Sequence, residues 1–318
     1  MPNQPGIADV HIDTPLQAVS IAWMQSEEVF ISNKVFPRVP VNHRSDLYWV
    51  FDRPNWFKVK SEKRAPGAPS AGDGWEVSTD SYLCDVWALH KDIPDQIRAN
   101  AAGNNWDMDR QATEFVTKDI MLTMDVDWAT RYFTTGIWQD DVTPAVLWDV
   151  GGSTPIEDIR AEILTLQRLT SYKPNTFVVT PEVWNVLQDH PDFIARINGG
   201  ATNSQPAIVT LNLMAQVLGL DRILVAEAVQ NIAIEGSDED MQFVFGKNCL
   251  LVYAAPQAGL MTPTAGLTFE WTGLVPGGVS VEKFRIRERK LDRIEVEAAW
   301  DQKVVSAEMG TFFSGVIS

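Results

Sequence analysis

The chain has 318 residues with a formal net charge of −16, and 45% of the residues are hydrophobic. This composition allows a globular protein with a sizeable core. The acidic balance argues against a surface that grips nucleic acid or an anionic membrane as a whole. Two cysteines, Cys84 and Cys249, are too few for a disulfide scaffold, so we expect both to be small buried hydrophobes. No stretch is long enough to span a bilayer and no signal peptide is present, which predicts a soluble protein made in the cytoplasm.

The first 45 residues alternate short apolar groups with polar residues and prolines, which is typical of an extended arm. Within this arm, only residues 18–31 have a pattern that suits a short helix. Residues 47–59 (LYWVFDRPNWFKV) and 75–91 (WEVSTDSYLCDVWALHK) predict two strands of a long hairpin, and Pro54 suggests an edge or a bulge. Each strand would reach about 40 Å. A lone hairpin is marginally stable in water, so it needs a surface on its own domain or on a neighbouring copy.

The longest helical pattern runs over residues 105–134 and ends before Gly136. Asp107 and Asp109 near its start suit the helix macrodipole. Asp125 and Asp127 lie two residues apart, do not share a face, and are interpreted as having no chemical role. The apolar positions of this helix recur at spacings of three and four: Ala112, Phe115, Val116, Ile120, Met124, Trp128 and Tyr132.

Residues 151–277 have the order strand, helix, helix, strand that predicts an α/β module. Thr154 is expected to cap a helix that begins at Pro155, with Glu157 completing a capping box. The other elements expected here are strands over 176–180 and 222–226 and helices over 181–190 and 206–218. After this module, residues 279–289 and 293–300 predict an antiparallel pair joined at 290–292, with one apolar and one charged face.

Motifs of catalytic and metal sites are absent from the sequence. The four histidines are widely spaced, no metal-ligand pattern or phosphate-binding loop is present, and the neighbouring His43, Ser45 and Asp46 are interpreted as a solvated turn. We therefore expect no catalytic, cofactor-binding or metal site, and no cofactor. The remaining unexplained feature is the charged tip of the hairpin, which is either a solvated loop or a reach toward a partner.

The order of these parts resembles the major capsid protein of tailed bacteriophages, whose fold is named after a Hong Kong phage. The local phrases VFPRVPV, EKRAPG, STDSYLCDVWALHKDIPDQIRANA, DRQATEFV, YKPNTFVVTPEVW and GKNCLLVYAAPQAGLMTPTAGLTF also look like this family. The resemblance covers nearly the whole chain. It implies an α+β, Hong Kong-phage-type major capsid fold. Its parts would be an N-terminal arm (1–46), an extended hairpin loop (47–93), a peripheral domain with the long spine helix (94–150), an α/β axial domain (151–277) and the C-terminal strands of the peripheral domain (278–318).

This resemblance implies a structural protein that assembles into pentamers and hexamers of an icosahedral shell around double-stranded DNA. Its partners would be other copies of itself, a portal, a scaffolding protein and possibly a decoration protein, with no membrane, and its place would be the virion after synthesis in the host cytoplasm. Some members crosslink a hairpin lysine to a neighbour, for which Lys58, Lys60 and Lys63 are the candidates. An encapsulin-like compartment and a soluble α/β enzyme remain the alternatives. Candidate inter-subunit contacts are Trp49, Trp56, Lys58, Lys60, Glu62, Lys63, Arg64, Trp75, Arg285, Arg287 and Arg289.

Overall fold

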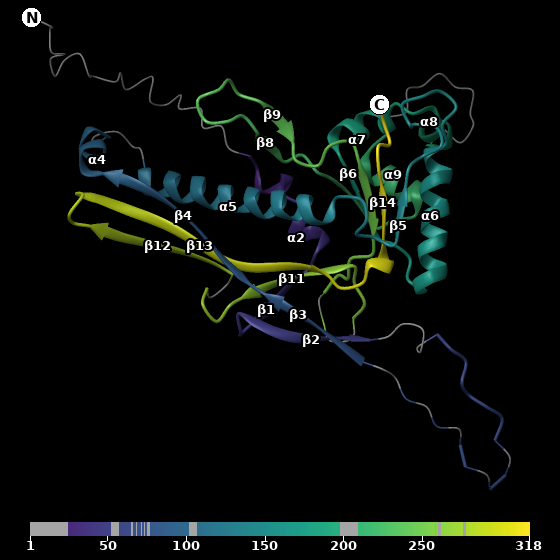
Figure 1. Cartoon of the computed structure of the whole chain (residues 1–318). Coiled ribbons are helices and arrows are strands. Elements are labelled where there is room, and N and C mark those ends of the chain that lie inside the picture. Colours follow the sequence, from purple (N-terminus) through teal and green to yellow (C-terminus); the bar gives the residue numbers. More distant parts are fainter. Residues whose placement is uncertain are drawn as a thin grey trace, which may run out of the picture.

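The computed structural model describes residues 25–51, 57–64, 66–67, 69–70, 72, 74, 77–101, 107–197, 209–257, 259, 262–275 and 278–318. A single long helix, α5 (Met108–Tyr132), extends along one five-stranded sheet and ends against a second one (Figure 1). The fold is α+β, as the sequence predicted.

The first sheet is built around β13 (Leu291–Val304), which is paired along most of its length. Its N-terminal part pairs antiparallel with β12 (Val279–Ile286) and with β4 (Asp85–Pro94), and its C-terminal part pairs with β11 (Gly266–Trp271). A parallel strand, β1 (Arg38–Val41), lies on the other edge of β11. The predicted pairing of the two C-terminal strands is therefore confirmed, with the turn at residues 287–290.

The second sheet is buried on both faces. Its order is β5 (Asp140–Val142), β14 (Gly310–Phe313), β10 (Cys249–Val252), β6 (Thr176–Val179) and β7 (Arg222–Val225). On β10, Cys249 and Leu251 join the core on one face, whereas Leu250 and Val252 join the core on the other. This alternation follows from the two-residue period of a strand. The sequence expectation that both cysteines are buried thiols is confirmed.

Four helices belong to the second sheet: α6 (Pro155–Thr170), α7 (Pro181–Gln188), α8 (Pro191–Ile197) and α9 (Leu211–Leu218). The sequence predicted three of them and missed α8, while residues 206–208 of the expected third helix lie outside the described residues. Sheet membership does not follow the range 151–277, because β5 and β14 come from outside it and β11 lies in the first sheet. The boundaries of the five proposed regions stay a prediction.

The capping box predicted at the start of α6 is wrong. Thr154 has backbone angles of −129° and 65°, and its side chain makes no capping hydrogen bond. Asp192 supplies an acceptor instead, because its Oδ2 lies 3.3 Å from the amide nitrogen of Ile156. A carboxylate from α8 thus replaces the local cap and joins two helices.

The predicted long hairpin is shorter than expected, and its second strand is divided. β2 (Ser45–Phe51) pairs with β3 (Val77–Leu83). The strand is interrupted at Cys84, and the chain then continues as β4 in the first sheet. The break has a clear cause, since the Cys84 amide donates to the carbonyl of Arg44 rather than into the β4–β13 ladder. Residues 57–59 are not in a strand, and Pro54 lies outside the described residues.

The helix expected over residues 18–31 is absent in its described part. Residues Glu27–Val29 form only a 3-10 turn, η2, followed by the short helix α2 (Ser32–Val35). Asp125 of α5 fixes this segment, because its two carboxylate oxygens accept from the amides of Ile31 (2.9 Å) and Ser32 (3.0 Å). Asp125 is fully buried. The role of Asp125 is therefore structural, and no feature of the sequence indicated this contact with residues 31 and 32.

We expect Asp125→Ala to lower the free energy of unfolding by about 2–6 kcal/mol, because two buried N–H groups would each lose their acceptor at about 1–3 kcal/mol per group. Chemical denaturation of the purified protein measures this change. The matched control is Asp119→Ala on the exposed side of the same helix, which should change stability little. Equal midpoints for the two variants would contradict the assignment.

Candidate assembly surfaces

The β2–β3 hairpin has an apolar face that is exposed in the described chain. Its register places Leu47 opposite Ser81 and Trp49 opposite Thr79, so these side chains share one face with Val77 and Leu83. Leu47 and Trp49 are 63% and 60% exposed, and Val77 and Leu83 are also exposed. A contiguous exposed apolar face of this kind marks an interaction site. We call it the hairpin outer face (Leu47, Trp49, Val77 and Leu83).

The opposite face of the hairpin anchors it to the body. Tyr82 stacks on Phe269 of β11 with ring centroids 4.5 Å apart, and Tyr48 packs against the same ring at 5.3 Å. At the root, the Leu83 amide donates to Asp301 Oδ2 at 2.9 Å. The hairpin is thus held at its root while its outer face is left free.

Burial at this root also decides the chemistry of Cys84. It raises the pKa of the Cys84 thiol to about 12, with the carboxylates of Asp301 and Asp85 adding to the shift. A thiol with such a pKa stays protonated and is a poor nucleophile. Its role is therefore packing, as the sequence predicted.

The distal connection between β2 and β3 is directed away from the body, and its described residues 57–64 are mostly exposed (Figure 1). Phe57 is 56% and Val59 89% exposed. Of the predicted contact residues, Lys58, Glu62, Lys63 and Arg64 are exposed and Lys60 is half-buried, whereas Trp56 and Trp75 lie outside the described residues. Leu47 was missed by sequence reasoning, although its spacing of two from Trp49 was an available signal.

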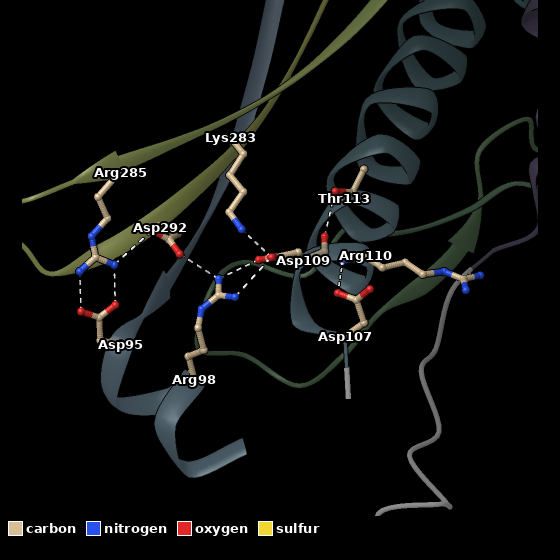
Figure 2. Close-up of polar contacts among 9 residues, drawn as sticks. All are labelled: Asp95, Arg98, Asp107, Asp109, Arg110, Thr113, Lys283, Arg285 and Asp292. Carbon is tan, nitrogen blue, oxygen red and sulfur yellow. Dashed lines mark hydrogen bonds and ion pairs between the residues drawn. The ribbon is translucent and has the colours of Figure 1, made fainter. Parts of the chain in front are cut away.

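A network of ion pairs ties together the ends of α4 (Asp95–Ala101), α5, β12 and β13 (Figure 2). Arg285 contacts both Asp95 (2.5 Å) and Asp292 (3.1 Å). Arg98 bridges Asp292 and Asp109 at 3.1 and 2.8 Å. Arg285 therefore forms these ion pairs within its own chain.

Asp109 is the most strongly perturbed carboxylate of this network. Lys283 Nζ lies 2.6 Å from its Oδ2, the oxygen that Arg98 Nη1 also contacts at 3.3 Å. The hydrogen bonds from Arg98 and Lys283 hold the pKa of Asp109 at about 2. The sequence placed Asp109 near a helix start but gave no sign of its two cationic partners. Arg287 and Arg289, the other two predicted contacts, are exposed in the turn between β12 and β13.

One buried pair of polar side chains has the residue types of a hydrolytic site but not its proton arrangement. Ser153 Oγ lies 2.9 Å from His190 Nε2. His190 Nδ1 accepts from the Asp192 amide, and Ser153 Oγ donates to the Val150 carbonyl. Nε2 is therefore the protonated nitrogen and donates to the serine, whereas a general base would have to accept from it. The pair holds the start of α6 against α8.

Other sites of chemistry are equally unsupported in the described part of the chain. No group of His, Cys, Asp or Glu among the described residues is arranged to hold a metal ion. A polar cleft of about 790 Å³ is lined by Asn33, Lys34, Arg38, Asn175 and Arg222. Within the described residues, no helix has the length and apolarity needed to cross a membrane.

Two curated proteins resemble the chain over nearly its full length. It is 23% identical over 312 residues to the major capsid protein of Pseudomonas phage JBD67, with 96% of this chain and 97% of that protein covered. It is 25% identical over 311 residues to the major capsid protein of Burkholderia phage BcepMu, with 96% of each covered. No family model matches the chain.

Solved structures with this fold include both phage proteins and a compartment protein. A phage-related protein of Bordetella bronchiseptica RB50 has a TM-score of 0.69 at 17% identity, with 95% of both chains covered. The capsid structure of cyanophage P-SCSP1u has a TM-score of 0.59 at 12% identity, covering 98% of this chain and 94% of that one. The holo-SrpI encapsulin complex of Synechococcus elongatus has a TM-score of 0.52 at 12% identity, with 95% of both covered.

The fold is the Hong Kong-phage-type capsid fold, which defines a class of shell-forming structural proteins. Within this class, the two relatives that the chain matches over nearly its full length are both phage major capsid proteins. These homologues are structural capsid proteins and not enzymes, which supports a structural protein of a phage head shell.

We expect Asp109→Asn to lower the midpoint of denaturation near neutral pH. The folded pKa of Asp109 is about 2, below the ordinary value of about 3.9. Its ionised form therefore stabilises the fold above about pH 4, and that contribution is lost as the pH falls toward about 2. The gap between wild type and variant should shrink over this range. Glu282→Gln, an exposed acid on β12, is the control, and a gap independent of pH would refute the assignment.

Proposed function

We propose that the chain forms pentamers and hexamers that close into an icosahedral shell around the double-stranded DNA genome of a tailed phage. The observation that carries this proposal is the hairpin outer face. A single chain exposes this apolar face on a two-stranded ribbon, and such a ribbon is only marginally stable in water without a further surface. A neighbouring copy of the chain supplies that surface in a closed shell.

The parts of the chain take the following roles in this proposal. Residues 1–46 form an arm along neighbouring subunits, and residues 47–93 form the extended loop that overlaps one neighbour. Residues 94–150 and 278–318 form the peripheral domain, and residues 151–277 form the axial domain around fivefold and sixfold centres. Its inter-subunit contacts are the candidates of the sequence analysis, and Leu47 joins them because it shares the hairpin outer face with Trp49.

The acidic net charge of the chain suits a shell that holds DNA without binding it tightly. The net charge of −16 keeps the number of Lys and Arg contacts to phosphate small, and these contacts dominate affinity for DNA. Further partners in this proposal are a portal, a scaffolding protein and a decoration protein. Synthesis takes place in the cytoplasm of the host, and the assembled protein resides in the virion.

An encapsulin-like compartment is the second candidate, because an encapsulin shares the fold at a TM-score of 0.52. The relatives covered over nearly their full length are phage capsid proteins, which favours the virion. The content of purified particles separates the two candidates, since an encapsulin would hold protein cargo and a phage head would hold DNA.

Size-exclusion chromatography and negative-stain electron microscopy of the purified protein test assembly directly. The proposal expects rings of five or six subunits or closed shells, with or without a co-expressed scaffolding protein. Monomers of 35.5 kDa under every condition of salt, crowding and scaffold would refute it.

Substitution of the hairpin outer face should separate folding from assembly. We expect Leu47→Ser with Trp49→Ser to leave the thermal midpoint of the subunit nearly unchanged, because both side chains are already exposed. The fraction of protein in rings or shells should fall several-fold, as measured by sedimentation velocity. Thr79→Ser, on the same face opposite Trp49, is the matched control and should assemble as wild type. Normal assembly of the double variant would remove this face from the interface.

A further inference from the structure

A second two-stranded ribbon carries exposed apolar side chains. β8 (Val229–Asn231) and β9 (Met241–Phe243) pair only with each other among the described strands. Ile234 is 82% and Met241 58% exposed, and Ile232 and Phe243 are also exposed. The register places Met241 and Phe243 on one face and Ile232 on the other, so apolar side chains are exposed on both faces of the ribbon.

Hydrogen bonds near its end and at its base fix the conformation of the ribbon. The side chain of Asn231 accepts from the amides of Ala233 and Asp240, and the Ile232 amide donates to the Asp240 carbonyl. At the base, the Gln25 side chain makes two hydrogen bonds with the backbone of Val229 (2.6 and 3.0 Å). An ordered ribbon with exposed apolar side chains at its end is a preformed docking surface.

The charge of the ribbon selects its partner. Between Ala226 and Gly246 the sequence has five acidic residues and no lysine or arginine. Four of the acids surround the exposed apolar residues and are themselves exposed: Glu235, Asp238, Glu239 and Asp240. The complementary surface must therefore combine positive charge with apolar side chains.

The β2–β3 connection has this combination. Phe57 and Val59 are exposed, and they alternate with Lys58 in a segment that continues to Lys63. Residues 57–64 carry four basic side chains and one acidic side chain. This exposed segment is both cationic and apolar, so it complements the acidic and apolar ribbon.

A single chain cannot bring these two surfaces together. The ribbon and the β2–β3 connection lie on opposite sides of α5 and point away from each other (Figure 1). The hairpin is fixed at its root by Tyr82 and Leu83, and the ribbon is fixed at its base by Gln25. Contact between them therefore requires two copies.

We propose that the β8–β9 ribbon of one subunit receives the β2–β3 connection of a second copy of the chain. The apolar residues of the two segments pack together, and Lys58 and Lys63 face Asp238 and Glu239. This inference rests on the proposed assembly and names the surface that receives the hairpin. Because exposed ion pairs are weak and screened by salt, the contact steers and registers neighbours, and its strength comes from repetition around the shell.

Charge reversal tests the contact in the full chain. We expect Lys58→Glu with Lys63→Glu, and separately Asp238→Lys with Glu239→Lys, each to lower the assembled fraction several-fold at physiological salt. The four substitutions together restore the attraction with inverted sign, so assembly should return to the wild-type level. Circular dichroism and thermal midpoints check that every variant folds.

A matched control separates specific pairing from net charge. Lys58→Glu and Lys63→Glu combined with Glu182→Lys and Asp189→Lys, two exposed acids at α7, has the same net charge as the four-substitution variant. This control should stay poorly assembled. The inference is overturned if the control is rescued equally, or if either reversal alone assembles normally.

A crosslink gives an independent readout. Ser61→Cys with Ser237→Cys places one thiol in each exposed segment, and the native Cys84 and Cys249 are buried. Under oxidised glutathione, assembled particles should yield subunits linked in chains on a non-reducing gel, while each single variant should not. If the double-cysteine variant assembles as the wild type does but shows no crosslink, the inference is overturned and the proposed shell function stands. Absence of any wild-type assembly would instead refute the shell function.

Discussion

The packing of α5 against both sheets is the interaction on which the rest of the subunit depends. Val116 and Ile120 in its first half join a core with Val296 and Trp300 of β13. Its C-terminal end lies in a second core. There the ring centroids of Trp128 and Phe36 are 5.6 Å apart, and those of Phe133 and Phe312 of β14 are 5.3 Å apart. Because a helix of this length is rigid and both of its ends are buried in different cores, it fixes the position of one sheet relative to the other.

Several segments that project from the two sheets are each held by one polar side chain. Asp125 holds the start of α2, Gln25 holds the base of the ribbon, and Asp301 holds the root of the hairpin. Burial raises the pKa of both Asp125 and Asp301, so each carboxylate is stable there only because backbone amides donate to it. These contacts orient the projecting segments without covering them.

The projecting ribbons explain why the subunit is complete only in an assembly. Two-stranded ribbons bury too little surface to be stable alone, yet this chain has two of them with exposed apolar faces. Residues 57–64 of the first ribbon are cationic and the second ribbon is acidic, and the positions of the two prevent contact within one chain. A subunit with these properties gains stability from its copies, and symmetry multiplies each modest contact.

The sequence by itself determined the long helix, both terminal strands and the buried strands over 176–179 and 222–225, since these depend on local periodicity. The fold class followed from the order of these parts and the family that this order resembles. It also placed a charged tip between two aromatic-rich strands. Tertiary structure alone decided the pairings between distant strands, because β4 leaves the hairpin at Cys84 for β13, about two hundred residues away in sequence. It likewise decided that Asp192 rather than Thr154 caps α6 and that Asp125 is buried. Such choices depend on contacts between distant segments, and a local pattern has no means of specifying them.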